Sequence, residues 1–138
     1  MQAAFEAGLT HFDTADSYGK GRSEELVGKA IHGFRDKIFL ATKGFPPFRE
    51  PERVTGAVFK EKVDASLKRL NTDWIDLYYI HWPVEGLDMR PVMEGLEEYR
   101  AQGKIKAIGV SNFSVEQMEQ VSEVGQINAH QFCYNLFW

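Results

Sequence analysis

Short apolar runs that end in polar side chains recur four times along this chain, and this recurrence constrains its fold more than any other feature. The runs and their polar residues are 10–15 with Asp13, 37–43 with Lys43, 75–81 with His81, and 105–111 with Ser111 and the following Asn112. Each run is strand-like. In a parallel sheet or barrel, functional side chains gather at the carboxyl ends of the strands. The sequence therefore predicts that these polar groups share one rim of a β/α sheet.

Helical patterns alternate with these runs. They cover residues 2–7, 23–33, 57–70, 91–102 and 114–124, and a fifth strand that carries Gln131 follows at 128–135. Ser114 and Gln117 have the spacing of a capping box at the start of the last helix. Uninterrupted alternation of helices and strands predicts an α/β fold built from βα repeats, with one domain over residues 1–138.

The first strand runs into a loop whose residues form an ordered motif. It consists of Phe12-Asp13-Thr14-Ala15, then Tyr18-Gly19, then Ser23-Glu24-Glu25 and Gly28-Lys29. This motif resembles the signature of the aldo-keto reductase family, and Lys43, His81 and the segment 109–113 follow in the order that the family requires. The resemblance implies a (β/α)8 TIM barrel that reduces aldehydes or ketones to alcohols by hydride transfer from NADPH.

Chain length decides how much of that barrel is expected. A complete (β/α)8 barrel takes about 250 residues, whereas this chain has 138. The five predicted strands match strands two to six of the barrel, so we expect an incomplete, open barrel of about five βα units. Its edge strands, 10–15 and 128–134, would offer unpaired backbone groups for self-association. Residues expected to line the inward face and to meet water are Phe39, Ala41, Leu77, Tyr79, Ala129 and Cys133.

The resemblance assigns the catalytic roles to Asp13, Tyr18, Lys43 and His81. Carbonyl reduction needs a proton donor, and an unperturbed tyrosine, with a pKa of about 10, is a poor acid at neutral pH. A nearby ammonium improves such a donor by stabilising the phenolate, and a carboxylate can hold that ammonium in place. Tyr18, Lys43 and Asp13 suit these three roles, while His81 suits a hydrogen bond to the substrate carbonyl.

The resemblance also implies a nicotinamide cofactor, NADP(H), with NAD(H) not excluded. Asp13, Ser111, Asn112 and Gln131 correspond to cofactor-binding positions, the last three holding the carboxamide of the nicotinamide. A small-molecule carbonyl substrate is expected beside Tyr18, His81 and Trp82, and the aromatic residues Phe45, Phe48 and Trp82 suggest an apolar pocket wall. No G-x-G-x-x-G follows a strand, so we expect the dinucleotide to be held in the barrel manner.

Composition argues against several other classes of function. The net charge is −4 and no basic run occurs, so nucleic acid is not an expected partner. No apolar stretch reaches ~18 residues and the N-terminus does not resemble a signal peptide, which predicts a cytoplasmic protein without a membrane span. No His-x-His or paired-carboxylate spacing indicates a metal site. The single cysteine, Cys133, lies in an apolar run and is expected to be a reduced, buried thiol.

Two interpretations of function stay open at this point. In the first, the chain is an aldo-keto reductase or a segment of one, since all four catalytic positions are present. In the second, it is a non-catalytic, barrel-derived binding or regulatory subunit, or an inactive truncated product. The family grips the adenosine 2′-phosphate with basic residues after its late strands, which this sequence does not reach. Titration with a nicotinamide cofactor separates the two interpretations.

Overall fold

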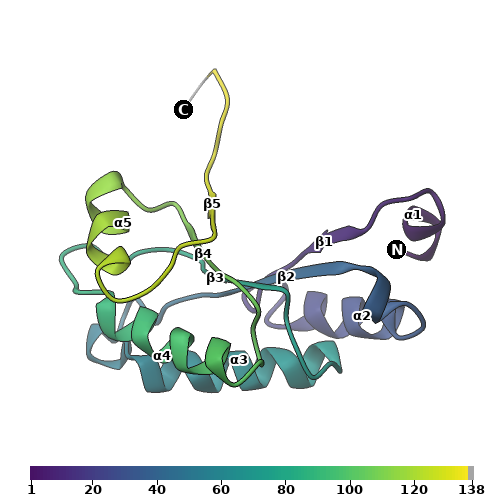
Figure 1. Ribbon diagram of the computed structural model, residues 1–138, viewed down its shortest axis with the longest axis horizontal. Helices are drawn as coiled ribbons and strands as arrows, with labels where there is room; N and C mark the ends of the chain where they lie inside the picture. Colours follow the sequence, from purple (N-terminus) through teal and green to yellow (C-terminus); the bar gives the residue numbers. More distant parts are fainter. Residues whose placement is uncertain (137–138) are drawn as a thin grey trace.

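Five short strands alternate with helices in the computed structural model, which describes residues 1–136 (Figure 1). The strands are β1 (His11–Asp13), β2 (Phe39–Gly44), β3 (Leu77–Ile80), β4 (Ile108–Ser111) and β5 (Ala129–Gln131). The α-helices are α1 (Gln2–Glu6), α2 (Arg22–Ile31), α3 (Gly56–Leu70), α4 (Arg90–Ala101) and α5 (Val115–Ser122), and 3₁₀ turns lie at Arg35–Lys37 and Pro51–Arg53. The predicted alternation is confirmed, although all five strands are shorter than expected.

All five strands are parallel, and they stand in the sheet in the order in which they occur in the chain. Each βα unit therefore places its strand beside the preceding one, which is how successive units of a (β/α)8 barrel are arranged. Helices α2 to α5 lie on one side of this sheet, and the segment after β5 projects away from it (Figure 1). The predicted incomplete barrel is thereby confirmed.

Helix starts and ends follow local side-chain chemistry. Ser114 caps α5, and the predicted capping box is present because Ser114 and Gln117 each accept a hydrogen bond from the other's backbone N–H. Helix α2 begins after Gly21, which is left-handed and provides no side-chain cap. Ser23 could have capped this helix, but its Oγ instead accepts a 2.8 Å hydrogen bond from Thr14 Oγ1.

The main core lies between the sheet and the helices. Because side chains alternate across a strand, Tyr78 and Ile80 of β3 point into this core, while Leu77 and Tyr79 point to the opposite, inward face. Helix α3 contributes Phe59, Val63 and Leu70, and α4 contributes Val92, Met93 and Leu96, all buried. The helices thus cover the outward face of every central strand.

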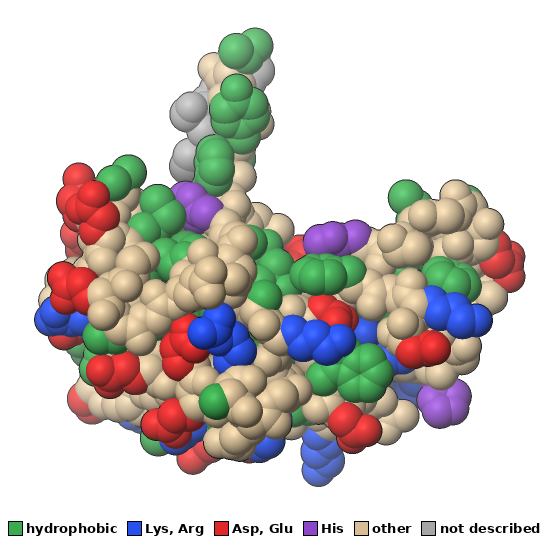
Figure 2. Space-filling view, in the orientation of Figure 1, with side chains coloured by type: hydrophobic (Ala, Val, Ile, Leu, Met, Phe, Trp, Pro, Cys, Tyr) green, Lys and Arg blue, Asp and Glu red, His purple; other side chains and the backbone are tan. Residues whose placement is uncertain are grey.

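The inward face is less exposed than the sequence suggested. We expected Ala41, Leu77 and Tyr79 to meet water, but all three are buried and pack together. Gly109 permits this packing, since a Cβ there would lie 2.5 Å from the Tyr79 ring. Phe39 is 38% exposed, in line with the prediction. Hydrophobic side chains are visible in the saddle between the segment after β5 and the α1 end (Figure 2).

The prediction of a buried thiol at Cys133 is wrong, because the residue is exposed, as the alternative expectation that it meets water in an open barrel required. Beyond β5 the chain leaves the sheet, and residues 132–136 are all exposed. No described element packs over this segment, so its apolar character does not bring burial. Among the described residues, no helix is long and apolar enough to cross a membrane.

A buried carboxylate ties β2 and β3 together near their amino ends. Asp76 Oδ2 accepts a hydrogen bond from Leu40 N at 3.0 Å and pairs with Arg35 Nη2 at 2.8 Å. Its Oδ1 accepts from Lys106 Nζ at 3.0 Å and from Trp74 Nε1 at 3.2 Å. Burial alone would raise the pKa of Asp76, but the Leu40 N–H and the two cations outweigh it and lower that pKa. The carboxylate is therefore ionised at neutral pH.

Replacement of Asp76 with alanine is expected to lower the free energy of unfolding by about 2–4 kcal/mol, because Arg35 and the Leu40 amide would lose their buried acceptor. Urea unfolding followed by circular dichroism measures the change. The control Glu50→Ala removes an exposed ion pair with Arg53 and should cost less than about 1 kcal/mol. Equal losses in the two variants would contradict the role assigned to Asp76.

Candidate active site

A nearly fully buried lysine stands at the carboxyl end of β2. The side chain of Lys43 is 1% exposed, and its Nζ donates to Asp13 Oδ2 at 2.5 Å and to the Thr14 carbonyl at 3.0 Å. A buried ammonium is costly unless it is paired and hydrogen-bonded. Both acceptors come from the end of β1, which is hydrogen-bonded to β2. The parallel pairing of these strands therefore sets the Lys43–Asp13 contact.

Tyr18 lies in the loop after β1, with its side chain partly exposed at the rim. The Lys43 ammonium is 5.4 Å from the centroid of the Tyr18 ring. The Tyr18 ring also meets the His81 ring edge to face, with centroids 5.8 Å apart. The structure thus brings together all four residues that the sequence placed at the catalytic centre, although they come from three separate strand ends.

His81 is buried at the end of β3. Its Nδ1 lies 3.5 Å from Ser17 Oγ, and the Phe45 ring stands edge-on to it at a centroid distance of 5.5 Å. Burial lowers the pKa of His81, and the Lys43 ammonium lowers it further, against the opposing effect of nearby carboxylates. The ring is therefore neutral at pH 7, with one nitrogen as a donor and the other as an acceptor.

The predicted cofactor residues of β4 and β5 also lie together. Asn112 takes a left-handed conformation with φ 62°, and its Nδ2 donates to the His81 carbonyl at 3.2 Å and to Ser111 Oγ at 3.0 Å. Its backbone N–H donates to the Gln131 carbonyl at 2.9 Å. Within residues 1–136, the Gln131 side-chain amide and Asn112 Oδ1 have no hydrogen-bond partner. This set of free amide donors and acceptors fits a carboxamide group.

Trp82 is 41% exposed. Together with Phe48 and Asn112 it lines a pocket of about 570 Å³ beside the rim, to which neither Tyr18 nor His81 contributes. The three aromatic residues predicted to form one pocket wall therefore do not all line the same pocket. Phe45 packs on His81 and also edge-on to Phe48, whereas Phe48 and Trp82 face the neighbouring pocket.

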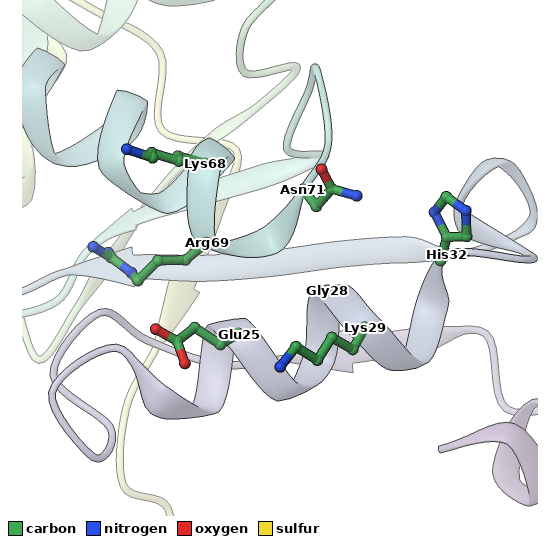
Figure 3. Close-up of a pocket in the computed structure, with 7 residues that line it drawn as sticks. All are labelled: Glu25, Gly28, Lys29, His32, Lys68, Arg69 and Asn71. Atoms are coloured by element: carbon green, nitrogen blue, oxygen red, sulfur yellow. The ribbon is translucent and has the colours of Figure 1, made fainter.

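A second pocket, of about 630 Å³, lies on the outer, helical side of the protein between α2 and α3 (Figure 3). None of the predicted site residues lines it. Its lining residues are Glu25, Gly28, Lys29, His32, Lys68, Arg69 and Asn71. The predicted catalytic residues thus lie together at the strand ends and not in this pocket.

Two residues that touch the candidate site were not singled out by sequence. Ser17 lies beside His81, and Asp16 accepts hydrogen bonds from Phe45 N at 2.9 Å and Lys62 Nζ at 3.2 Å. The motif carried a partial signal for both, since they occupy the two positions between Ala15 and Tyr18 that the family signature leaves open.

Comparison with known proteins identifies the chain. The fold and its rim define a (β/α) barrel protein with a lysine–aspartate pair beside a tyrosine and a histidine. A family model described as "Aldo/keto reductase family" matches residues 1–138. The chain belongs to the aldo/keto reductase family, as its motif predicted.

Several relatives of this family are similar over nearly the whole chain. Aldo-keto reductase YhdN of Bacillus subtilis (strain 168) is 45% identical over 99% of this chain and 43% of its own length. Methylglyoxal reductase YeaE of Escherichia coli (strain K12) is 36% identical over 99% of this chain and 47% of its own. The chain thus spans about half the length of the curated relatives that it matches.

Solved structures agree with the fold. The aldo/keto reductase of Klebsiella pneumoniae in complex with NADP and acetate superposes with a TM-score of 0.84 at 34% identity, covering 96% of this chain and 46% of that one. The thermostable aldo-keto reductase Tm1743, in complex with the inhibitor epalrestat, gives a TM-score of 0.87 at 37% identity, covering 97% of this chain and 48% of that one.

The pH dependence of stability tests the environment of His81. Because burial lowers its pKa in the folded state, the unfolded chain binds a proton first as the pH falls below about 6.5. The free energy of unfolding is expected to decrease from there until folded His81 also titrates. Urea titrations at a series of pH values measure this slope.

His81→Gln should flatten the slope, whereas His32→Gln, at an exposed position, should leave it unchanged. A parent slope equal to that of His81→Gln would contradict the lowered pKa.

Proposed function

We propose that this protein is an oxidoreductase that reduces small aldehydes or ketones to alcohols with NADPH, with Tyr18 as the proton donor. The observation that carries the proposal is the buried Lys43 ammonium, which is paired with Asp13 and lies beside the Tyr18 ring. A buried ion pair is a weak source of stability. Its place next to a phenol and an imidazole supports a chemical role instead.

Proton transfer in this proposal runs through three residues. Tyr18 gives its hydroxyl proton to the carbonyl oxygen, which becomes the alcohol. The Lys43 ammonium stabilises the negative charge that develops on the phenol oxygen, and Asp13 holds the ammonium in place. Because the site is partly closed to water, this charge stabilisation is stronger than it would be in solvent.

His81 orients the substrate. As a neutral imidazole it donates one N–H to the carbonyl oxygen, which polarises the C=O bond and places that oxygen next to the Tyr18 hydroxyl. Ser17 Oγ lies 3.5 Å from Nδ1 and can donate to it when Nε2 carries the ring proton, the tautomer that this proposal uses. The substrate therefore meets a single ring donor rather than a second positive charge beside Lys43.

When bound, a nicotinamide cofactor would supply a hydride to the carbonyl carbon. Ser111, Asn112 and Gln131 would hold its carboxamide and so orient it toward the substrate. The free Asn112 Oδ1 and the free side-chain amide of Gln131 support this assignment, as do the structural neighbours from Klebsiella pneumoniae that are complexes with NADP and NADPH. The name of the Escherichia coli relative, methylglyoxal reductase, supports a small carbonyl compound as substrate.

Tyr18→Phe in the complete protein is expected to lower kcat by ~10² to 10⁴, the usual contribution of a general acid. Affinity for NADPH should change little, because the lost hydroxyl contacts the substrate. Steady-state assays with NADPH and an aldehyde measure kcat, and fluorescence titration measures cofactor binding.

Tyr99→Phe is a matched control, since it removes a phenol hydroxyl that bonds Asp64 between α3 and α4. A Tyr18→Phe enzyme with kcat within a few-fold of this control would reject Tyr18 as the donor.

Lys43→Met is expected to lower kcat by at least ~10², because the charge on the phenol oxygen loses its stabilising ammonium. The protein should stay folded, since Asp13 is 35% exposed and water can solvate its carboxylate. Circular dichroism and steady-state kinetics check both statements. Lys104→Met, which removes a surface pair with Asp64, should keep the parent kcat. Parental turnover in Lys43→Met would contradict the mechanism.

A further inference from the structure

We propose that Asp16 is a positioning residue, which fastens the loop of Tyr18 to the loop of Phe45 and so holds both aromatic rings against His81. The inference rests on the proposed reductase function and adds a residue to it. Asp16 touches neither substrate nor reacting atoms in this scheme, and acts through the groups that it holds.

Asp16 is attached to the body of the protein at three points. Its backbone N–H donates to the Lys43 carbonyl at 3.0 Å. Its Oδ1 accepts from Phe45 N at 2.9 Å, and its Oδ2 accepts from Lys62 Nζ of α3 at 3.2 Å. With a side chain only 11% exposed, it joins the end of β1 to the end of β2 and to α3.

A carboxylate strengthens this contact. Phe45 comes directly after β2, and Asp16 Oδ1 is the one acceptor that its N–H finds within residues 1–136. A hydrogen bond to an ionised oxygen is stronger than one to a neutral oxygen. Lys62, whose side chain is 27% exposed, supplies the opposite charge that a partly buried carboxylate needs.

Tyr18 depends on this attachment because nothing within residues 1–136 hydrogen-bonds its hydroxyl. Its ring is held by its own backbone, through Tyr18 N to the Ala15 carbonyl and Ser23 N to the Tyr18 carbonyl, both at 3.2 Å. Three successive residues after it have positive φ, namely Gly19, Lys20 and Gly21, of which only Lys20 is not a glycine. The Asp16 contacts anchor the chain two residues before Tyr18, on the side of it opposite this turn in the sequence.

Both rings that Asp16 holds meet the same imidazole. Tyr18 and Phe45 stand edge to face with His81, at interplanar angles of 77° and 88°. A displacement of about 1 Å between reacting groups can cost ~10²-fold in rate. Loss of the Asp16 contact would therefore reduce turnover even though the catalytic side chains are all present.

The charge of Asp16 provides a second readout. The groups that act on the His81 charge are Lys43, which lowers its pKa, and Asp16 and Asp13, which raise it, while Ser17, Tyr18 and Phe45 are neutral neighbours. Removal of the Asp16 charge should therefore move the His81 titration to lower pH. Removal of a carboxylate that does not act on His81, such as Asp88, would leave that titration in place.

The test compares Asp16→Ala, Asp16→Asn and Lys62→Met in the complete protein. Asp16→Ala loses the contact and the charge, Asp16→Asn keeps an amide oxygen for Phe45 N–H but loses the charge, and Lys62→Met loses only the cation. Asp88→Ala is the matched control, because Asp88 also accepts a backbone N–H and pairs with an arginine, Arg90, but lies after β3 on the surface.

Asp16→Ala is expected to lower kcat by ~10- to 100-fold relative to Asp88→Ala, with KM within about 3-fold, since orientation rather than binding is lost. Amide exchange at Phe45 should accelerate by at least ~10-fold. Asp16→Asn should show a smaller loss of kcat and slower exchange than Asp16→Ala, together with a His81 titration at lower pH by NMR.

Each outcome decides one part of the proposal. Faster exchange at Phe45 with control-level kcat would overturn the positioning role, and unchanged exchange would overturn the contact itself. If Asp16→Ala fails to fold, Asp16→Asn replaces it in the test. A control-level kcat in Asp16→Asn would then overturn the positioning role, and an unchanged His81 titration would overturn the link between the Asp16 charge and His81. A parent protein that reduces no carbonyl compound with NADPH would refute the proposed function, while the exchange and titration results would still confirm or overturn the link from Asp16 to Phe45 and His81.

Discussion

Burial of one ammonium group organises the rim of this protein. Lys43 is almost completely withdrawn from water, so its charge must be matched within the protein. Asp13 and the Thr14 carbonyl provide that match, and both stand where β1 ends, one strand away. The pairing that satisfies the lysine thus also fixes where the next loop begins. Tyr18 follows five residues after Asp13, so its position depends on this ion pair as much as on its own contacts.

The opposite face of β2 is held by a second buried charge. Glu24 of α2 is 0% exposed, and it accepts from Thr42 Oγ1 at 2.7 Å and from Arg69 Nε of α3 at 2.6 Å. Thr42 and Lys43 are neighbours in the strand, so their side chains point to opposite faces. Strand β2 is therefore fixed by a carboxylate from each side, Asp13 inward and Glu24 outward. This arrangement explains how a solvent-facing rim can hold a lysine in one orientation.

How far the sequence predicts this structure depends on the range of the interaction. Asp13, Lys43 and His81 were predictable, because each ends a strand and parallel strands meet at one edge. The Ser114 cap was predictable because its partner lies three residues away. The Asp16–Phe45 bond spans 29 residues and has no periodicity to reveal it. Burial of the Cys133 thiol was predicted from its apolar run, but such a run predicts burial only when another element packs on it. The burial of Tyr79 depends on Gly109 on a different strand.

The residues proposed to transfer the proton and those proposed to hold the carboxamide come from different strands but are linked by hydrogen bonds. Asp13, Tyr18, Lys43 and His81 all come from β1 to β3 and the first loop, whereas Ser111, Asn112 and Gln131 come from β4 and β5. Asn112 connects the two sets, since its Nδ2 donates to the His81 carbonyl while its backbone N–H donates to the Gln131 carbonyl. Its left-handed backbone makes both contacts from one residue. A shift of Gln131 would therefore reach His81 through Asn112, so that under the proposed function the position of the cofactor would be coupled to the orientation of the carbonyl.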